Sequence, residues 1–344
     1  MALNCDVDIS NSPPDWDGYL SGHSHATLFH HPGWGRVMEG AYGNRPWYLT
    51  ARREGRIVGT LLLVTQRSLL FGCHLCSIPY MDVSGILSED MEASNALTHQ
   101  AAVVMREERA RWVELRHERQ LPVALPARTD KITFRLALPS DPDELWAGFK
   151  SKLRTKIGRP GRNGMTCSSG GEEMLGDFHQ VYARNMRDLG SPPHSLRFFR
   201  LLVEHFRSSV RFFVVRQGGT TLAASLTFFD RRGVHVPWSG SDWRVRHLSP
   251  NMLLYWTMIS EAARFGAPHF DFGRCSRDSG TYDFKQQWGG QEVPLTWHYI
   301  LADGQSLPDL RPDSPRYRLM VACWKRLPVA VVKAIGPRII SKLS

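Results

Sequence analysis

The sequence has no run of about 18 apolar residues, the length that a membrane-spanning helix needs. Its first residues contain acids and prolines and no apolar core of a secretory signal peptide. Only six cysteines are scattered over 344 residues, and a chain of this length can bury a core without disulfides. These absences predict a cytoplasmic protein with reduced thiols.

Metal-binding patterns are also incomplete. Cys73 and Cys76 have the spacing of half a zinc site, but no second pair follows at a suitable distance. Four histidines gather near the N-terminus without a neighbouring carboxylate or cysteine to complete a ligand set: His23, His25, His30 and His31. We therefore predict that the protein holds no metal and no tightly bound cofactor.

The composition is that of a globular protein with a basic surface. Apolar residues make up 42% and charged residues 22%, and the formal net charge is +10. A positive balance favours anionic partners, such as phosphorylated glycan precursors, nucleotides, tRNA or the anionic inner face of a membrane. A basic surface without a specific partner is the alternative.

The order of elements predicts an α/β protein with two similar halves. Each half has helices, a hairpin with a glycine in its turn, a buried strand, a long helix and a short alternating strand. This order recurs from Val58 to Val113 and from Leu222 to Phe270. We predict mixed central sheets flanked by helices, divided into residues 1–138, residues 139–306 and a basic tail at 307–344.

Polar side chains are most concentrated between Phe270 and Gly290, after a predicted strand. The run contains Asp271, Arg274 and Lys285, separated by glycines and aromatic residues. Polar loops at strand ends commonly carry binding sites. A surface loop fixed by its aromatic residues is the alternative.

Three motifs resemble the FemAB-type peptidyltransferase family, in the branch found with exosortase/PEP-CTERM and exopolysaccharide systems. They are Tyr282-Asp-Phe-Lys-Gln-Gln-Trp-Gly289, Asn185-Met-Arg-Asp-Leu-Gly-Ser-Pro192, and Trp324 followed by Leu327-Pro and Ile335-Gly-Pro337. The resemblance runs from about Trp16 to Ile340. Cys275 departs from it, because that branch usually has serine there.

The resemblance implies two tandem GNAT-like domains that transfer an activated aminoacyl group to an amine. Other members take the group from aminoacyl-tRNA and pass it to a peptidoglycan precursor, with the motif lysine at the reaction centre. That role carries over to Lys285. Amine attack on an ester or thioester places negative charge on the carbonyl oxygen, which a nearby ammonium would stabilise. The same cation would alternatively hold a terminal tRNA phosphate.

The same comparison suggests further site residues. An acid that acts after a strand of the first half corresponds best to Asp82, whose carboxylate would orient the amine or accept its proton. A turn-capping aspartate is the alternative there. The substrate-binding candidates are Arg274, Tyr282, Phe284, Trp288, Arg187 and Asp188. For Arg274 the alternative is a structural ion pair with Asp271 or Asp283, and Arg187 and Asp188 also fit a helix terminus.

Glycines that would hold a CoA pyrophosphate are missing before the predicted helix at Ser249. The sequence there is Arg246-His-Leu-Ser-Pro-Asn251, in which Ser249 is suited to N-cap the helix and Pro250 to its first turn. Without glycines, close approach of the backbone to a pyrophosphate is disfavoured. This counts against plain acetyl-CoA chemistry, and the donor stays open between aminoacyl-tRNA and acyl-CoA.

Two basic segments suggest anionic partners. Lys150–Arg162 has six basic residues and no acid, which fits either a tRNA or nucleotide contact or a solvated helix face broken by Gly158 and Pro160. Arg316–Ser344 has seven basic residues and no acid. With prolines interrupting any long helix, it fits either an anionic membrane surface or a tail packed on the second domain.

Three functions remain open from the sequence. The first is aminoacyl or acyl transfer to an amine on a cell-envelope or exopolysaccharide precursor. The second is acyl-CoA-dependent N-acyl transfer to an amino sugar. The third is a non-catalytic protein that binds nucleic acid or a membrane surface, against which the polar run around Lys285 argues.

Overall fold

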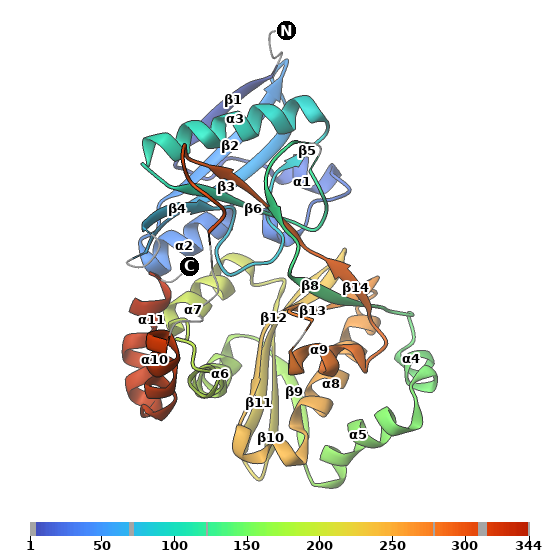
Figure 1. Ribbon diagram of the computed structural model, residues 1–344. Coiled ribbons are helices and arrows are strands. Elements are labelled where there is room, and N and C mark those ends of the chain that lie inside the picture. The colour runs from blue at the N-terminus through green and yellow to red at the C-terminus, as the bar shows by residue number, and fades with distance from the viewer. Residues whose placement is uncertain (1–4, 69–71, 122, 278, 309–314, 343–344) are drawn as a thin grey trace. The chain divides into compact units, whose positions relative to one another are not determined.

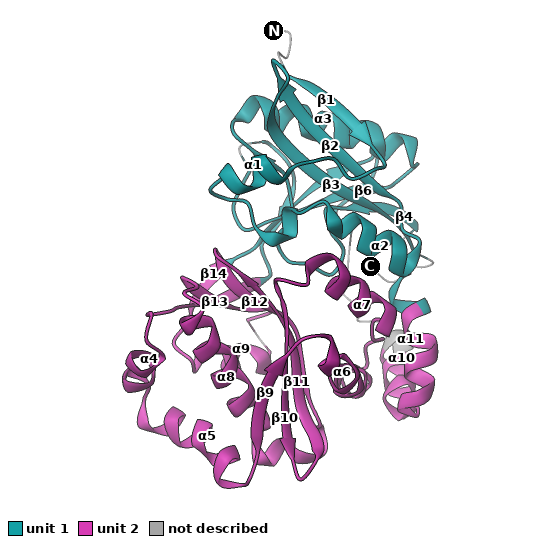
Figure 2. Ribbon diagram, turned by 180° about the vertical axis from the view of Figure 1, so that it is seen from behind, with its two compact units in different colours: residues 1–131, 294–310, 338–344 teal, residues 132–293, 311–337 magenta. Residues whose placement is uncertain are grey.

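The computed structural model describes residues 5–68, 72–121, 123–277, 279–308 and 315–342. The chain forms two compact units (Figure 2), of which unit 1 comprises residues 1–131, 294–310 and 338–344, and unit 2 comprises residues 132–293 and 311–337. Each unit has its own mixed sheet with helices packed on it (Figure 1), which confirms the predicted α/β class. Within the described ranges, no helix is both long and apolar enough to cross a membrane.

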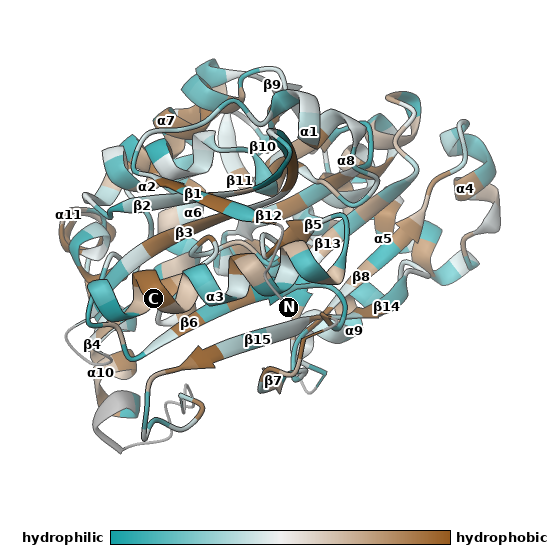
Figure 3. Ribbon diagram, turned by 90° about the horizontal axis from the view of Figure 1, so that it is seen from above, coloured by the Kyte–Doolittle hydropathy of each residue, from teal (hydrophilic) through white to brown (hydrophobic). Residues whose placement is uncertain are grey.

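The sheet of unit 1 has the order β1-β2-β3-β4-β6-β15-β7, with β5 paired to β3. Its strands are β1 (Asp6–Ser10), β2 (Pro46–Arg53), β3 (Arg56–Ser68), β4 (Gly72–Cys76), β5 (Leu87–Ser88), β6 (Trp112–His117), β7 (Ala127–Arg128) and β15 (Thr296–Leu301). The pairing of β4 with β6 is parallel, and the other pairs are antiparallel. The hydrophobic stretch of β3 (Figure 3) is buried, as expected of a central strand.

The helices of unit 1 are α1 (Asp17–Gly22), the 3-10 helix η1 (Leu28–His30), α2 (Gly33–Tyr42) and α3 (Met91–Glu107). Asp90 is the N-cap of helix α3, and its side chain accepts a hydrogen bond from the amide of Ala93. Ala93, Leu97, Ala101 and Val104 form its buried stripe and pack into the core of unit 1. Helix α3 therefore connects β4 to β6 while covering one face of the sheet (Figure 1).

The sheet of unit 2 has the order β14-β8-β13-β12-β11-β10-β9. Its strands are β8 (Ile132–Ala137), β9 (Thr166–Gly170), β10 (Val210–Gln217), β11 (Thr220–Asp230), β12 (Gly233–Ser241), β13 (His269–Cys275) and β14 (Gln291–Pro294). Strands β12 and β13 are parallel, and α8 connects them. Unit 2 thus repeats the strand–helix–strand crossover that β4, α3 and β6 make in unit 1.

Helices cover both faces of this second sheet, with α6 and α8 on opposite sides (Figures 1 and 2). The helices of unit 2 are α4 (Pro142–Gly148), α5 (Ser151–Arg162), η2 (Glu172–Met174), α6 (Leu175–Leu189), α7 (Leu196–Phe206), η3 (Trp243–Leu248), α8 (Pro250–Arg264), α9 (Gly280–Gln286), α10 (Pro315–Arg326) and α11 (Val329–Ile340). The last residues of α11 are counted with unit 1.

Two strands belong to a different unit from the one that the predicted division at residues 138 and 306 assigns them to. Strand β8 lies before residue 138 but pairs antiparallel with β13 of unit 2. Strand β15 lies before residue 306 but pairs antiparallel with β6 of unit 1. The compact units therefore differ from the predicted segments 1–138 and 139–306. The reason is that each parallel pair gains its next neighbour from the other half of the sequence.

Two prolines lie inside helices that the sequence analysis expected them to break. Helix α5 runs through Gly158 and Pro160, because Leu153, Ile157 and Pro160 form one buried stripe and the helix ends two residues later. Helix α11 contains Pro337 close to its end, whereas Pro328 does separate α10 from α11. These are corrections to the sequence prediction.

Candidate active site

The parallel strands β12 and β13 pair over only two residues. Val234 lies opposite Phe270 and His235 lies opposite Asp271, and no further pair follows. The ladder ends at this point, so the last residues of β13 and the segment that follows no longer pair with β12. All the polar residues of the predicted site from 271 to 288 follow this point in the sequence.

Asp271 is the buried acid at the end of this ladder, with 5% of its surface exposed. Its carboxylate accepts hydrogen bonds from the Thr133 hydroxyl and from the Gly273 amide, and it pairs with the Arg135 Nε at 3.1 Å. Burial by itself would raise the pKa of Asp271, but His235, Arg135 and these hydrogen bonds lower it below its ordinary value. The carboxylate is therefore a charged anchor between β8 and β13.

A bulge interrupts β13 directly after this anchor, since its register with β8 shifts between Asp271 and Arg274. Gly273 adopts a φ of 74°, in the left-handed region, and a Cβ atom there would come within 2.8 Å of the Val236 carbonyl oxygen. Both facts require glycine at this position. The bulge turns the Gly273 and Arg274 carbonyls away from the regular ladder.

Lys285 donates to those two carbonyls. It lies on α9, is 6% exposed, and its Nζ is 2.5 Å from the Gly273 oxygen and 2.9 Å from the Arg274 oxygen. Asp271 holds the amide of the bulge and Lys285 holds its carbonyls, so two charged side chains fix the same turn. Lys285 lies on a short helix and not, as expected from the sequence, in a loop.

Aromatic rings surround this turn. Tyr255 of α8 stacks on Phe272 and contacts Phe284, with ring centroids 5.7 Å and 4.9 Å apart, and its hydroxyl is 2.8 Å from the Ser239 Oγ. Trp288 is 1% exposed, and its buried Nε1 has no hydrogen-bond partner among the described residues. Of the two residues predicted to bind substrate, Trp288 thus belongs to the core of unit 2, and Phe284 is partly buried and packs against that core.

The other predicted residues of this segment reach its surface. Arg274 is exposed, and the Tyr282 hydroxyl donates to the Glu292 carboxylate. Cys275 is buried; burial raises the pKa of its thiol, while the Lys285 charge acts to lower it. The sulfur therefore lies within the electrostatic reach of the ammonium.

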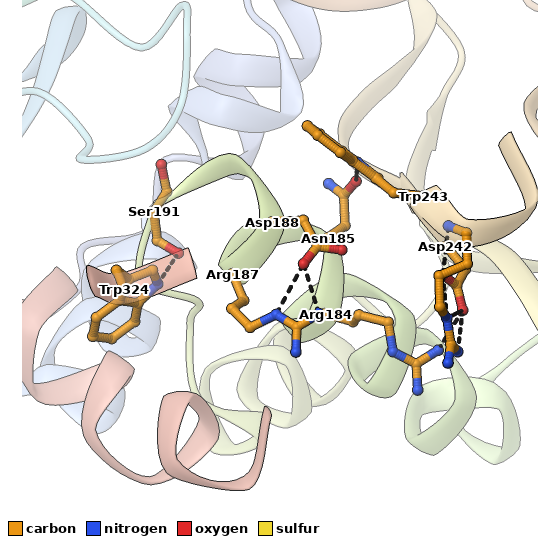
Figure 4. A network of polar contacts seen from close by, with 9 residues as sticks. Arg184, Asn185, Arg187, Asp188, Ser191, Asp242, Trp243 and Trp324 are labelled. Atoms are coloured by element: carbon orange, nitrogen blue, oxygen red, sulfur yellow. Dashed lines mark hydrogen bonds and ion pairs between the residues drawn. The ribbon is translucent and has the colours of Figure 1, made fainter. Parts of the chain in front are cut away.

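Arg187 and Asp188 form a local pair at the end of α6 (Figure 4). The Arg187 guanidinium donates twice to one oxygen of Asp188, at 2.9 and 2.7 Å. Nearby, Asn185 accepts from the indole of Trp243 at 3.2 Å. The helix-terminal alternative therefore describes this pair in the structure, and a role in substrate binding stays a prediction.

Asp242 is the buried centre of an ion-pair network beside this helix (Figure 4). Arg184 donates to it at 2.8 Å and Arg244 at 2.6 Å. The hydrogen bonds from Arg244 lower its pKa to about 2. Neither residue was predicted from the sequence: Arg184 directly precedes the motif that begins at Asn185, and Asp242 lies outside the motifs.

Asp82 belongs to unit 1, in the segment after β4. Its main-chain oxygen accepts from the indole of Trp297 at 3.2 Å. Burial acts to lower the pKa of Arg116, but Cys76, Glu114 and, least, Asp82 raise it above its ordinary value. Arg116 lies 4.3 Å above the ring of Trp297 and donates to the Met81 carbonyl at 2.6 Å. The main chain at Asp82 is thus held by neighbours, and a part for its carboxylate in proton transfer stays a prediction.

Unit 1 has its own buried acid at the matching place. Strands β4 and β6 also pair over two residues, with Leu75 opposite Val113 and Cys76 opposite Glu114. Glu114 accepts from Arg116 at 2.6 Å and from the Tyr299 hydroxyl at 2.9 Å. The alternation of Glu114 and Arg116 within a buried strand was the sequence pattern that would have revealed this pair.

The start of α8 offers few amides to an anion. Ser249 has a φ of 60° and makes no side-chain cap, contrary to the sequence prediction, although Pro250 does occupy the first turn. The amides of Ser249 and Met252 donate to the Arg246 and Ser249 carbonyls, and proline has no amide hydrogen. A pyrophosphate of CoA would therefore find little support there.

Two cavities lie within unit 1. One of about 590 Å³ is lined by His23, His25, His30 and His117 together with Glu89 and Asp90. Within the described part of the chain, no three His, Cys, Asp or Glu side chains come close enough to hold a metal. The second cavity, of about 350 Å³, is lined by Arg45, Arg67 and Lys342 around Glu108.

Comparison with known proteins agrees with this architecture. A family described as acetyltransferase (GNAT) domain matches residues 148–286. No curated protein sequence matches the chain. The crystal structure of FemX is similar with a TM-score of 0.66 and 15% identity, covering 91% of this chain and all of that one.

Two further solved structures are similar at lower identity. L-PGS from Bacillus licheniformis has a TM-score of 0.57 and 13% identity, and the match covers 92% of this chain and 98% of that one. A tandem GNAT protein from the clavulanic acid biosynthesis pathway has a TM-score of 0.53 and 11% identity, and the match covers 88% of this chain and 100% of that one. At such identities these likenesses concern the fold alone. The chain is an α/β protein of two tandem GNAT-like domains.

Proposed function

We propose that this protein transfers an aminoacyl or acyl group to an amine acceptor on a cell-envelope or exopolysaccharide precursor. The observation that carries the proposal is the buried ammonium of Lys285, held against the bulge of β13 where the parallel ladder of unit 2 ends. A buried cation is costly unless hydrogen bonds or an opposite charge compensate it, and here two main-chain carbonyls accept its hydrogen bonds. We assign to it the task of stabilising the negative charge that develops on a reacting carbonyl oxygen.

The reaction joins a carbon to a nitrogen and releases an alcohol or thiol. The neutral amine attacks the carbonyl carbon of the donor ester or thioester, and the carbonyl oxygen becomes negative. The C–O or C–S bond then breaks, the leaving oxygen or sulfur takes up a proton, and the amine nitrogen loses one. Lys285 acts on the oxyanion, and a base or water takes up the amine proton.

Aminoacyl-tRNA is the proposed donor, and acyl-CoA is the alternative. The basic helix α5 supports the first, because its surface carries Lys152, Lys156 and Arg162 with no acid in the helix. The match of residues 148–286 to an acetyltransferase domain supports the second. The occupied amides at the start of α8 weigh against CoA, so we derive no step through it.

Single-turnover transfer with Lys285→Met tests the role of the ammonium. We expect the rate to fall by about 10²–10³, as for removal of one oxyanion-stabilising donor. Lys131→Met removes a half-buried lysine that pairs with Asp130 and should leave the rate unchanged. Because Lys285 also holds the bulge, circular dichroism and thermal melting must show that the variant is folded. A folded Lys285→Met protein with the normal rate contradicts the mechanism.

The donor is identified by supplying each candidate separately. Purified protein is incubated with tRNA carrying a radiolabelled amino acid, or with labelled acetyl-CoA, and an amino-sugar or peptide amine as acceptor. Label that moves to the acceptor only from charged tRNA supports the first donor. Label that moves only from acetyl-CoA selects N-acyl transfer, and no transfer from either rejects both donors.

A further inference from the structure

Exposed apolar side chains concentrate on the last two helices. Within the described residues, the large hydrophobic side chains that are at least one-third exposed include four on α10 and α11: Leu319 (66%), Met320 (52%), Val331 (40%) and Ile335 (37%). Apolar patches that remain in water commonly mark a surface that binds a partner or a membrane.

Narrow contacts attach these helices to unit 2. On α10, Trp324 is buried and its indole donates to the Ser191 carbonyl at 3.1 Å. On α11, Val332 and Gly336 are buried, and a Cβ atom at Gly336 would come within 2.5 Å of Pro193. Figure 1 shows both helices at the edge of unit 2, on the outer side of α6. Most of their circumference is consequently left for another contact.

The two helices expose the same kind of stripe. On α10 it consists of Leu319, Ala322, Cys323 and Arg326, and on α11 of Val331, Ala334, Ile335 and Arg338, all of them exposed. Both sets have the spacing i, i+3, i+4 and i+7, which places their members on one face of a helix. Each stripe is therefore apolar along its length and ends in an arginine.

The charge of the segment has a single sign. No acid occurs from residue 316 to residue 344. The six described basic side chains of the segment are all exposed: Arg318, Lys325, Arg326, Lys333, Arg338 and Lys342. Exposed apolar stripes with only basic residues beside them in the segment complement a surface that has an apolar layer beneath negatively charged groups. Nucleic acid offers the negative charge but no apolar layer for Leu319 and Ile335.

The geometry points to α10 and α11 as a docking surface for an anionic lipid bilayer, on which the two helices lie in the headgroup region. The apolar stripes enter the boundary of the acyl chains, while the long Lys and Arg side chains reach the lipid phosphates. Neither helix is long enough to span the membrane, so the contact is peripheral and reversible. It would bring the enzyme to lipid-borne acceptors.

Vesicle flotation with the full chain tests this surface. We expect binding to vesicles of phosphatidylcholine mixed with phosphatidylglycerol, weak binding to phosphatidylcholine alone, and loss of binding at high salt. Arg326→Gln with Arg338→Gln should weaken binding about 25-fold, since each basic side chain at such a surface contributes about fivefold. Leu319→Ser with Ile335→Ser should weaken it roughly tenfold or more, because the apolar insertion is lost.

Matched variants control for charge and hydrophobicity. Arg207→Gln with Arg231→Gln removes two exposed arginines elsewhere, and Met91→Ser removes a 58% exposed hydrophobic side chain of α3. Both should bind vesicles like the unchanged protein.

A second readout uses the exposed Cys323 on α10. An environment-sensitive dye on this sulfur should shift to the blue when anionic vesicles are added, and a dye placed on Met91→Cys in a Cys323→Ser background should not.

Several outcomes would overturn the inference. They are equal binding to neutral and anionic vesicles, absence of binding to both, or loss of binding in the matched controls. A dimer in solution that becomes monomeric in Leu319→Ser with Ile335→Ser, without any vesicle binding, would assign the surface to a second copy of the chain. Because the readout is lipid binding and not transfer, a failure here leaves the proposed reaction unaffected.

Discussion

The two units share a parallel strand pair with a crossover helix, and they differ in the strand that carries the buried acid. In each, a parallel pair joined by a crossover helix ends after two residues, and a buried acid lies at that point: Glu114 in unit 1 and Asp271 in unit 2. In unit 1, β6 continues beside β15 without a change of register. In unit 2, β13 bulges at Gly273, and the bulge carbonyls hold Lys285.

That difference separates a structural half from a candidate catalytic half. Arg116, the buried cation of unit 1, donates to the neighbouring carboxylate of Glu114, so its charge is locally neutralised. The Lys285 ammonium lies on carbonyl oxygens beyond a broken strand. A cation placed on neutral oxygens keeps more of its field for an approaching oxyanion than one bound to a carboxylate. Variants in each of the two units test this difference.

The largest expected effect is the loss of a buried acid. Glu114→Gln should lower the free energy of unfolding by about 3–5 kcal/mol, because Arg116 remains buried without its opposite charge. Asp271→Asn should cost less, about 2–3 kcal/mol, since Arg135 is more exposed and the amide still accepts hydrogen bonds. Urea denaturation measures both. Equal losses would show that the two acids are energetically equivalent and that the comparison fails.

Removing the glycine of the bulge should come next. Gly273→Ala introduces a Cβ into a left-handed residue and against the Val236 carbonyl, and should cost about 3 kcal/mol. Gly280→Ala, where nothing lies within 4 Å of the added atom, is the control and should cost under 1 kcal/mol. Thermal and urea unfolding compare the two variants, and similar losses would mean that the bulge is not constrained.

Acidification should destabilise both units through buried histidines. Burial lowers the pKa of His117 in unit 1 and of His194 in unit 2 to about 3. Their unfolded forms bind protons below about pH 6.5 while the folded forms stay neutral, so stability falls as the pH drops from there. Each of the two histidines should lower the free energy of unfolding by about 2 kcal/mol between pH 6.5 and pH 5.

Urea unfolding at several pH values checks this prediction. His194→Phe keeps a ring against Phe198 and should remove the contribution of one histidine from the dependence of the free energy of unfolding on pH. An unchanged slope would mean that His194 does not titrate differently in the folded and unfolded chain.

The smallest expected effect concerns the two crossover helices. Asp90 caps α3 with its side chain, whereas Ser249 at the start of α8 is left-handed and makes no cap. Asp90→Ala should cost about 1 kcal/mol, and Ser249→Gly should be neutral or stabilise by up to about 1 kcal/mol, because glycine tolerates that backbone. Thermal melting distinguishes them. Destabilisation by Ser249→Gly would show that the hydroxyl has a role at this helix end.

Much of the fold was predictable because its elements carry local patterns. The apolar run of β3 and the glycine turn at Gly55 are local patterns that indicate the hairpin of β2 and β3. In α6, Leu175, Phe178 and Tyr182 recur at helical spacing and are buried, which is likewise a local pattern. The capping of α8 was not predictable, since the left-handed Ser249 results from how η3 joins the helix.

The candidate site was predictable in part. The density of polar residues between Asp271 and Lys285 indicated where to look, and the family resemblance singled out the lysine. Its partners were not predictable, because Thr133 and Arg135 lie more than 130 residues before Asp271 in the sequence. Asp242 likewise pairs with Arg184, which lies on a helix far from it in the sequence.

The sequence by itself determined the α/β class, the repeated order of elements and the basic tail, because periodicity, turn residues and charge act over short distances along the chain. Tertiary structure decided that β8 and β15 complete sheets of the opposite half, that a bulge interrupts β13, and that α10 and α11 keep their apolar stripes exposed. These features depend on which residues distant in sequence pack together, and packing is a property of the whole fold.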